Sequence, residues 1–214
     1  MTTGAPRDAA DVAASHWEAV YRGKPSQGVS WYRPHLEMSL ALLRQAGLTP
    51  TQRIIDVGGG ASTLVDDLLS LGLRAITVLD LSSAALAVAR ERLGAQADTV
   101  HWQVGDLLEV PFAQGAFDLW HDRAVLHFLT EPAQERRYAA QLAHALRPGG
   151  HAVIGGFAPD GPQRCSGLPV ARRSASEIAA LLGPAFRLLD QRSERHLTPA
   201  GTEQAFAYAL LQRR

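Results

Sequence analysis

Three aspartates in this chain each lie at or just beyond a short apolar run, where a carboxylate could bind a small ligand. Asp56 lies in the run 54–57, Asp80 ends a run that begins at residue 75, and Asp106 closely follows the run 99–104. If each run is a strand of a parallel sheet, the acids meet at the edge where such sheets bind ligands. Asp80 follows Asp56 at close to the spacing, about 20 residues, at which an acid accepts both ribose hydroxyls of a nucleotide.

Three consecutive glycines, Gly58, Gly59 and Gly60, separate the first apolar run from a helix expected over residues 62–71. Strand, glycine turn and helix form the entry to a Rossmann-type nucleotide site. A dinucleotide motif would read G-x-G-x-x-G/A, but Thr63 occupies the last position. Asp56 would also repel a pyrophosphate and attract a cation such as the amino group of an amino acid. An NAD-dependent oxidoreductase is therefore the least favoured reading.

Asp56, Gly58 and Gly60 resemble the D/E-x-G-x-G start of the first motif of class I S-adenosylmethionine (SAM)-dependent methyltransferases, although Ser62 stands where a third glycine is usual. The run L-R-P-G-G at residues 146–150 is a second match. The resemblance implies SAM as cofactor and S-adenosylhomocysteine as product. It also implies a set of cofactor-binding residues, with Asp80 on the ribose and Asp106 on the adenine amino group: Asp56, Gly58, Gly59, Gly60, Asp80, Leu81, Asp106, Leu107 and His121.

A polar segment, His121, Asp122 and Arg123, follows the apolar run 116–120. As the end of a fourth strand it would border the cleft where the methyl group emerges. His121 is then a candidate base or substrate contact, and Asp122 and Arg123 are candidates to orient it or to bind substrate. An Asp–Arg pair that caps the next helix is an equally favoured alternative.

The chain before the first strand is rich in aromatic residues, including Trp17, Tyr21, Trp31 and Tyr32. Its pattern W-x-x-x-Y-x(9)-W resembles the arm of methyltransferases that act on thiols and related small nucleophiles, and of some protein-lysine methyltransferases. We expect a lid that excludes water from the site. Packing on the sheet edge is the alternative. The single cysteine, Cys165, lies in a polar loop over residues 158–169 and is expected to be a pocket wall rather than a reactant.

The remaining pattern is α/β. Helices are expected over residues 8–21, 35–46, 131–146 and 174–182, and a closing strand pair over 186–194 and 204–211. With the resemblance, this predicts a three-layer Rossmann-like fold with a seven-stranded, mostly parallel sheet, an antiparallel last strand and an N-terminal helical lid. The lid would occupy residues 1–33 and the methyltransferase domain residues 34–214.

Composition limits the class of partner. The 214 residues carry 21 basic and 21 acidic side chains, so no overall field favours nucleic acid or an anionic membrane. One cysteine, no signal peptide and no membrane-spanning run suggest a cytoplasmic protein, and no metal site is expected. The sequence thus predicts methyl transfer to a small nucleophilic acceptor. A protein lysine as acceptor and a SAM-binding protein without catalysis remain the alternatives, and the oligomeric state is not indicated.

Overall fold

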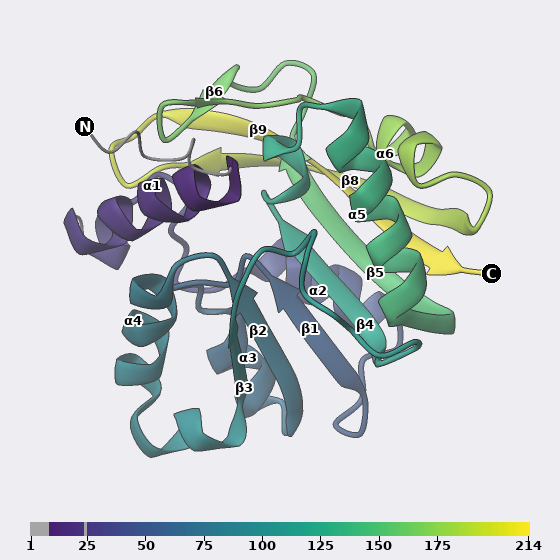
Figure 1. Ribbon diagram of the computed structural model, residues 1–214, viewed down its shortest axis with the longest axis horizontal. Helices are drawn as coiled ribbons and strands as arrows, with labels where there is room; N and C mark the ends of the chain where they lie inside the picture. Colours follow the sequence, from purple (N-terminus) through teal and green to yellow (C-terminus); the bar gives the residue numbers. More distant parts are fainter. Residues whose placement is uncertain (1–8, 24) are drawn as a thin grey trace, which may run out of the picture.

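The computed structural model describes residues 9–23 and 25–214 and contains a seven-stranded sheet in the order β3-β2-β1-β4-β5-β9-β8 (Figure 1). The first five strands along the chain pair in parallel, whereas β9 is antiparallel to both β5 and β8. These strands are β1 (Arg53–Val57), β2 (Ala75–Asp80), β3 (His101–Val104), β4 (Phe117–Arg123), β5 (Leu146–Phe157), β8 (Phe186–Leu197) and β9 (Glu203–Arg213). The predicted fold class is confirmed.

Helices cover both faces of the sheet, so the fold has three layers (Figure 1). The α-helices are α1 (Ala9–Gly23), α2 (Glu37–Gln45), α3 (Leu64–Ser70), α4 (Ser83–Leu93), α5 (Pro132–Ala145) and α6 (Ala175–Leu182). Three short 3-10 helices are η1 (Ser26–Gly28), η2 (Gly94–Thr99) and η3 (Leu126–Phe128). None of the helices in the described part of the chain is long and apolar enough to cross a membrane.

The core has two parts because alternate residues of a strand point to opposite faces. In β1, Ile54 packs with the apolar residues of α2 and α3, and Ile55 packs with those of α5 and α6. Both side chains are fully buried. A run of β-branched residues that is apolar on both faces therefore becomes a central parallel strand.

The sheet grows outward from β1 in two directions, with β2 and β3 on one side and β4 and β5 on the other. Chain connections thus leave toward opposite sides at the β1–β4 boundary. In open α/β sheets a ligand crevice forms at such a switch point, outside the carboxyl ends of the strands. The glycine turn after β1 lies at this place.

Two segments differ from the sequence pattern. The L-R-P-G-G run precedes the apolar stretch that suggests a strand from residue 151, but β5 already begins at Leu146. β4 continues through residue 123, so the polar segment forms the end of the fourth strand, as expected. The loop 158–169 contains a small hairpin of β6 (Arg164–Cys165) and β7 (Leu168–Pro169). Strand pairing on both sides of β4 and β5 extends these segments beyond their apolar stretches.

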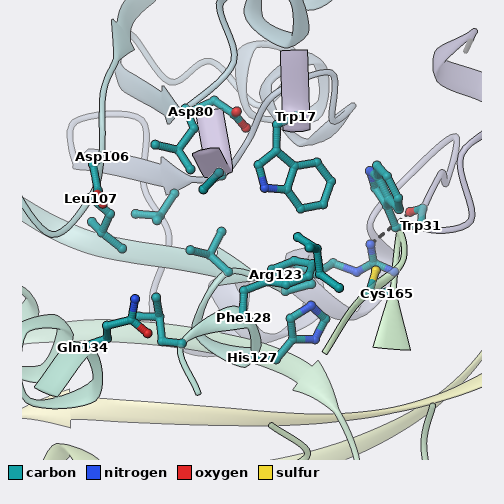
Figure 2. Close-up of a pocket in the computed structure, with 18 of the residues that line it drawn as sticks. Trp17, Trp31, Asp80, Asp106, Leu107, Arg123, His127, Phe128, Gln134 and Cys165 are labelled. Atoms are coloured by element: carbon teal, nitrogen blue, oxygen red, sulfur yellow. Dashed lines mark hydrogen bonds between the residues drawn. The ribbon is translucent and has the colours of Figure 1, made fainter. Parts of the chain in front are cut away.

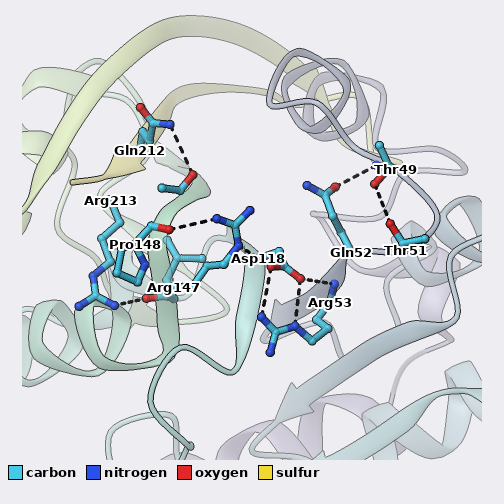
Figure 3. A network of polar contacts seen from close by, with 11 residues as sticks. Thr49, Thr51, Gln52, Arg53, Asp118, Arg147, Pro148, Gln212 and Arg213 are labelled. Carbon is cyan, nitrogen blue, oxygen red and sulfur yellow. Dashed lines mark hydrogen bonds and ion pairs between the residues drawn. The ribbon is translucent and has the colours of Figure 1, made fainter.

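A network of ion pairs and hydrogen bonds joins the amino ends of β1, β4 and β5 (Figure 3). Asp118 of β4 accepts hydrogen bonds from the backbone N–H of Arg53 at 2.8 Å and from its Nε at 3.0 Å. The Nε of Arg147 in β5 donates to the same carboxylate at 2.5 Å. These bonds hold the pKa of Asp118 well below its usual range. Asp118 therefore has a structural role at the amino ends of these strands.

Candidate active site

A cavity of about 300 Å³ lies at the carboxyl ends of β1, β2, β3 and β4 (Figure 2). Its floor includes Gly58 and residues that directly follow β2 and β3. Helix α1 and the segment before α2 contribute Trp17 and Trp31, and the hairpin β6–β7 contributes Cys165. Segments far apart in sequence therefore meet at the edge that the strand pattern predicted.

The glycine turn after β1 is tight and leaves no room for side chains. Gly58 and Gly60 have φ angles of +64° and +43°, which L-amino acids with a Cβ rarely adopt. A Cβ on Gly58 would lie 2.1 Å from Cγ2 of Val125, and one on Gly60 would lie 2.8 Å from Oδ2 of Asp80. The turn thus brings bare backbone to the cavity edge, where a ligand can approach closely.

Asp80 ends β2, lines the cavity and is buried. Its Oδ1 accepts the backbone N–H of Ser82 at 2.8 Å. Burial, together with the nearby negative charges of Asp56 and Glu18, raises the pKa of Asp80 to about 7. Among the described residues, only backbone N–H groups bond to this carboxylate, and no cation or hydroxyl donor stabilises its charge.

Asp106 and Leu107 line the same cavity beyond the end of β3. Oδ1 of Asp106 accepts the backbone N–H of Leu108 at 2.8 Å, which fixes the carboxylate in the turn. The backbone N–H of Gly105 donates to the carbonyl of Asp80 at 2.9 Å and ties the two strand ends together. Asp80, Leu81, Asp106 and Leu107 are thus brought together as the strand pattern predicted.

His121 and Asp56 lie at the edge of a smaller pocket of about 40 Å³ and do not line the larger cavity. His121 Nδ1 is 2.7 Å from Asp56 Oδ1, and its Nε2 is 2.8 Å from the Oγ of Ser39 in α2. All three side chains are almost completely buried. The order serine, histidine, aspartate matches that of a hydrolase triad, but Ser39 has no exposed surface from which to attack a substrate.

Both ring nitrogens of His121 are therefore engaged inside the protein. The expectation that His121 borders the methyl-transfer cleft as a base must be corrected, because strand alternation turns its side chain toward α2. Its contact with Asp56 instead supports the strand end that leads into the glycine turn. Gly59 lines the smaller pocket with these residues, whereas Gly60 lines neither.

Asp122 points to the opposite face of β4 and has no exposed surface. It accepts hydrogen bonds from the backbone N–H groups of Val125 at 2.8 Å and Leu126 at 3.1 Å, and from the Tyr138 hydroxyl at 2.7 Å. Burial raises its pKa to about 6. Asp122 therefore caps the η3 turn, which agrees with the capping alternative, although it forms no ion pair with Arg123. It does not reach the cavity.

Arg123 is the member of the polar segment that lines the cavity. Its Nε donates to the hydroxyl of Tyr208 at 3.0 Å. Its Nη1 donates to the carbonyl of Trp31 at 3.0 Å (Figure 2). The guanidinium carbon lies 4.7 Å from the ring centroid of Phe206. Arg123 thereby joins β4, β9 and the N-terminal arm.

The aromatic arm covers one side of the cavity. Trp17 makes edge contacts with Trp31 and Phe128, with ring centroids 5.8 Å and 5.1 Å apart. Tyr21 also lines the cavity, whereas Tyr32 lines only the smaller pocket. This position fits both a lid and fixed packing, so the lid and the domain division at residue 33 stay predictions.

Glu18 attaches the arm to the cofactor-binding half of the sheet. Its Oε1 accepts the backbone N–H groups of Ser83 at 2.6 Å and Ala84 at 3.2 Å, and the Ser83 hydroxyl at 2.7 Å. A carboxylate at a helix N-terminus stabilises unpaired N–H groups. Helix α1 therefore caps α4, whose own N-cap Ser82 bonds Ala85 N–H at 3.1 Å.

Comparison with known proteins agrees with this geometry. Residues 54–150 match a family model described as a methyltransferase domain. The chain is 33% identical over 167 residues to the O-methyltransferase cnsE of Penicillium expansum, over 70% of this chain and 58% of that protein. The family model and this relative both support a class I SAM-dependent methyltransferase. The predicted family is confirmed.

Solved structures share the fold of this methyltransferase. A protein from work on the conversion of a disulfide bond into a thioacetal group during echinomycin biosynthesis has a TM-score of 0.74 and 22% identity, over 94% of this chain and 91% of that one. The 1,6-didemethyltoxoflavin-N1-methyltransferase of Burkholderia thailandensis has a TM-score of 0.72 and 22% identity, over 99% and 93%. The matches span between 20% and 58% of the length of the curated relatives.

Several residues of the methyltransferase cavity were not singled out from the sequence as part of the site. The far wall is formed by residues from η3, β5 and β9, and they are His127, Phe128, Phe157, Gln204 and Phe206. His127 lies in η3, shortly after β4. Its position after β4 was the available signal, because that segment was already expected to border the cleft.

Cys165 lines the cavity and is buried, as expected for a pocket wall. Burial raises the pKa of its thiol to about 11, so the thiol is protonated at neutral pH and is a weak nucleophile. Within residues 9–23 and 25–214 no group of three or more His, Cys, Asp or Glu side chains could hold a metal ion.

Proposed function

We propose that this protein binds SAM in the cavity and transfers its methyl group to a small nucleophilic acceptor. The observation that carries the proposal is the placement of Asp80 and Asp106 beside the glycine turn in one cavity. In this arrangement Asp80 accepts the ribose hydroxyls, and Asp106 with Leu107 receives the adenine. Glycine at position 58 leaves bare backbone for the cofactor at the cavity edge, and a Cβ there would displace Val125, which also lines the cavity.

The raised pKa of Asp80 supports a ligand with hydroxyl donors at this position. A buried carboxylate whose pKa is about 7 gains much from donors that stabilise its charged form. Two ribose hydroxyls match the two oxygens of a carboxylate. Asp56, with an unpartnered buried Oδ2 beside the smaller pocket, provides negative charge for the amino group of the cofactor.

When bound, SAM supplies a methyl group already activated by positively charged sulfur. The protein then has to orient the acceptor and exclude water. Trp17, Trp31 and Phe128 form an apolar wall over the cavity. A compact, largely apolar chamber suits a small acceptor, and we propose that these side chains align it with the methyl group.

Experiments can distinguish this function from three others. Isothermal titration with SAM and with NAD identifies the cofactor, and we expect heat only with SAM. Incubation with labelled SAM and cell lysate, followed by separation of proteins from small molecules, identifies the acceptor class. Label in a small molecule other than SAM supports the proposal, whereas label on a protein favours the lysine alternative. Binding of SAM with no label beyond SAM itself would indicate a binding protein without catalysis.

We also propose a cytoplasmic location, which rests on the single cysteine, Cys165, as a free thiol. Fractionation of cells that express the protein tests this. Recovery outside the cytoplasm would contradict it.

A further inference from the structure

Charged groups in the cavity are separated by sign. Its two carboxylates, Asp80 and Asp106, lie on one side of the view in Figure 2, and Arg123 lies on the other beside Trp31 and Cys165. The walls around Arg123 are mostly aromatic, with Phe157 and Phe206 completing them. The end of the cavity left for the acceptor therefore combines one cation with flat apolar surfaces.

Arg123 has no carboxylate partner among the described residues. Its hydrogen bonds go to the Tyr208 hydroxyl and the Trp31 carbonyl, and its Nη2 is buried without any partner. Arg123 as a whole is partly buried, and a guanidinium group without a direct ion pair is stabilised by an anion that binds to it. The guanidinium group of Arg123 can therefore still donate hydrogen bonds.

Glu194 of β8 compensates this charge only in part. It accepts a hydrogen bond from Tyr208 at 2.8 Å, and the positive charge of Arg123 helps to lower its pKa, but the two side chains form no ion pair. The other oxygen of Glu194 is paired with Arg33. One carboxylate thus faces two guanidinium groups, and one positive charge remains.

His127 provides a second donor in the same wall. The backbone N–H of Phe157 points to His127 Nδ1 at 3.5 Å, so a neutral ring carries its proton on Nε2, which is buried without a partner. Burial and the positive charges of Arg173 and Arg123 lower its pKa to about 3, so the ring stays neutral. His127 can therefore donate a hydrogen bond but accepts a proton poorly.

We propose that the acceptor is an organic anion with a flat apolar body, and that Arg123 is the counter-ion of its carboxylate or similarly acidic oxygen. This inference rests on the proposed function, because it concerns the acceptor end of the same cavity. The aromatic walls hold the body, and the guanidinium recognises the charge. Neutral analogues leave the arginine unpaired and bind more weakly.

The test compares ligands of equal shape that differ in charge. Titration calorimetry measures the binding of benzoate and benzamide, and of 2-naphthoate and 2-naphthamide, to protein saturated with S-adenosylhomocysteine. We expect at least one carboxylate to bind about tenfold or more tightly than its amide, the scale of a charge-assisted hydrogen bond. Arg123→Gln should reduce this preference to less than about threefold.

Arg164→Gln is the matched control, because Arg164 lies in β6 outside the lining of the cavity and bonds only the carbonyl of Gly167 among the described residues. It should keep the wild-type preference. Arg123→Lys keeps the charge and should retain part of the preference, which covers the case in which Arg123→Gln does not fold.

The outcomes separate the two proposals. If wild-type protein binds S-adenosylhomocysteine but prefers neither carboxylate, or binds none of the probes at millimolar concentration, the anionic acceptor is wrong and the methyltransferase proposal stands. A preference that survives in Arg123→Gln would remove Arg123 as the counter-ion. Failure to bind S-adenosylhomocysteine at all would instead contradict the proposed function.

Discussion

Asp80 lies at the carboxyl end of β2, and Asp118 lies near the amino end of β4 in the same sheet. Their environments differ. Asp118 accepts hydrogen bonds from Arg53 and Arg147, which lower its pKa. Asp80 is more deeply buried, has Asp56 and Glu18 as negative neighbours, and its pKa is raised to about 7. Arginines of the chain neutralise the charge of Asp118, whereas no cation among the described residues pairs with Asp80.

This difference separates a structural acid from a candidate binding acid. The paired Asp118 stabilises the fold at the amino ends of the strands and has nothing left to bind. The buried charge of Asp80 lowers the stability of the fold, and a ligand that supplies hydrogen-bond donors restores this stability. Function is therefore expected where the fold leaves a charge unsatisfied, and the following predictions test this from the largest effect to the smallest.

Two left-handed glycines at opposite ends of the sheet provide the largest contrast. Gly58 (φ +64°) lies at the cavity, and Gly115 (φ +63°) lies near the amino ends. Alanine at either position strains the backbone by about 1–2 kcal/mol. We expect only Gly58→Ala to weaken S-adenosylhomocysteine binding, by roughly 100-fold or more, because its Cβ lies 2.1 Å from Val125.

Calorimetry and thermal unfolding of both variants check this prediction. Gly58→Val, with a larger β-branched side chain, should abolish binding while far-UV circular dichroism stays near that of the wild type. Normal binding by either Gly58 variant would contradict the proposed pocket.

Neutralising each aspartate should have opposite effects on stability. Asp80→Asn removes an unfavourable buried charge, so Tm at pH 8 should rise, while S-adenosylhomocysteine affinity falls by about 1.5–3 kcal/mol. Asp118→Asn loses a favourable pairing, so Tm should fall by roughly 2–4 °C for each 1 kcal/mol lost, with unchanged affinity. Differential scanning calorimetry and ligand titration measure both. Equal affinities in the two variants would remove Asp80 from the site.

The ionisation of Asp80 and that of Asp118 should affect the protein in different pH ranges. The folded pKa of Asp80 is raised, so its ionised form, which accepts the ribose hydroxyls, is lost as pH falls below about 7. S-adenosylhomocysteine affinity should weaken by up to roughly tenfold per pH unit there. The folded pKa of Asp118 is lowered, so its stabilisation is present above its unfolded pKa and is lost only in strong acid.

Titrations between pH 5.5 and 8.5 test the first part, with Asp80→Asn as the variant that should flatten the profile. Asp118→Asn is the matched control and should keep the wild-type slope. A flat profile in the wild type would show that ionisation of Asp80 does not control binding.

The smallest effects are expected in the arm that covers the cavity. If it acts as a lid, trypsin should cut after Arg22 more slowly when S-adenosylhomocysteine is bound, because binding orders the segment. Lys24 lies outside the described residues, and both Lys24 and Arg33 precede a proline, which blocks cleavage by trypsin. Trp17→Ala and Trp31→Ala should lower turnover more than SAM affinity. Equal cleavage with and without ligand, together with a loss of stability but not of rate, would show that the arm is fixed packing.

Local patterns in the sequence were enough to predict the sheet and the cofactor end of the site. A β-branched run, a glycine turn and an acid after the second strand are short-range features with direct physical consequences. They led correctly to β1, to Gly58 at the cavity and to Asp80 and Asp106 in one place. The family resemblance added the antiparallel strand β9, which local pattern alone would not have ordered within the sheet.

Only the tertiary structure decided which residues of the segment 121–123 face the cavity. Strand alternation and the partners on neighbouring elements send His121 toward Ser39, Asp122 toward Tyr138 and Arg123 into the cavity. The acceptor wall from η3, β5 and β9 likewise depends on long-range pairing. Sequence by itself determined which strands end in carboxylates, because that is a property of neighbouring residues. The structure decided which charges stay unpaired, because partners come from distant segments brought together by packing.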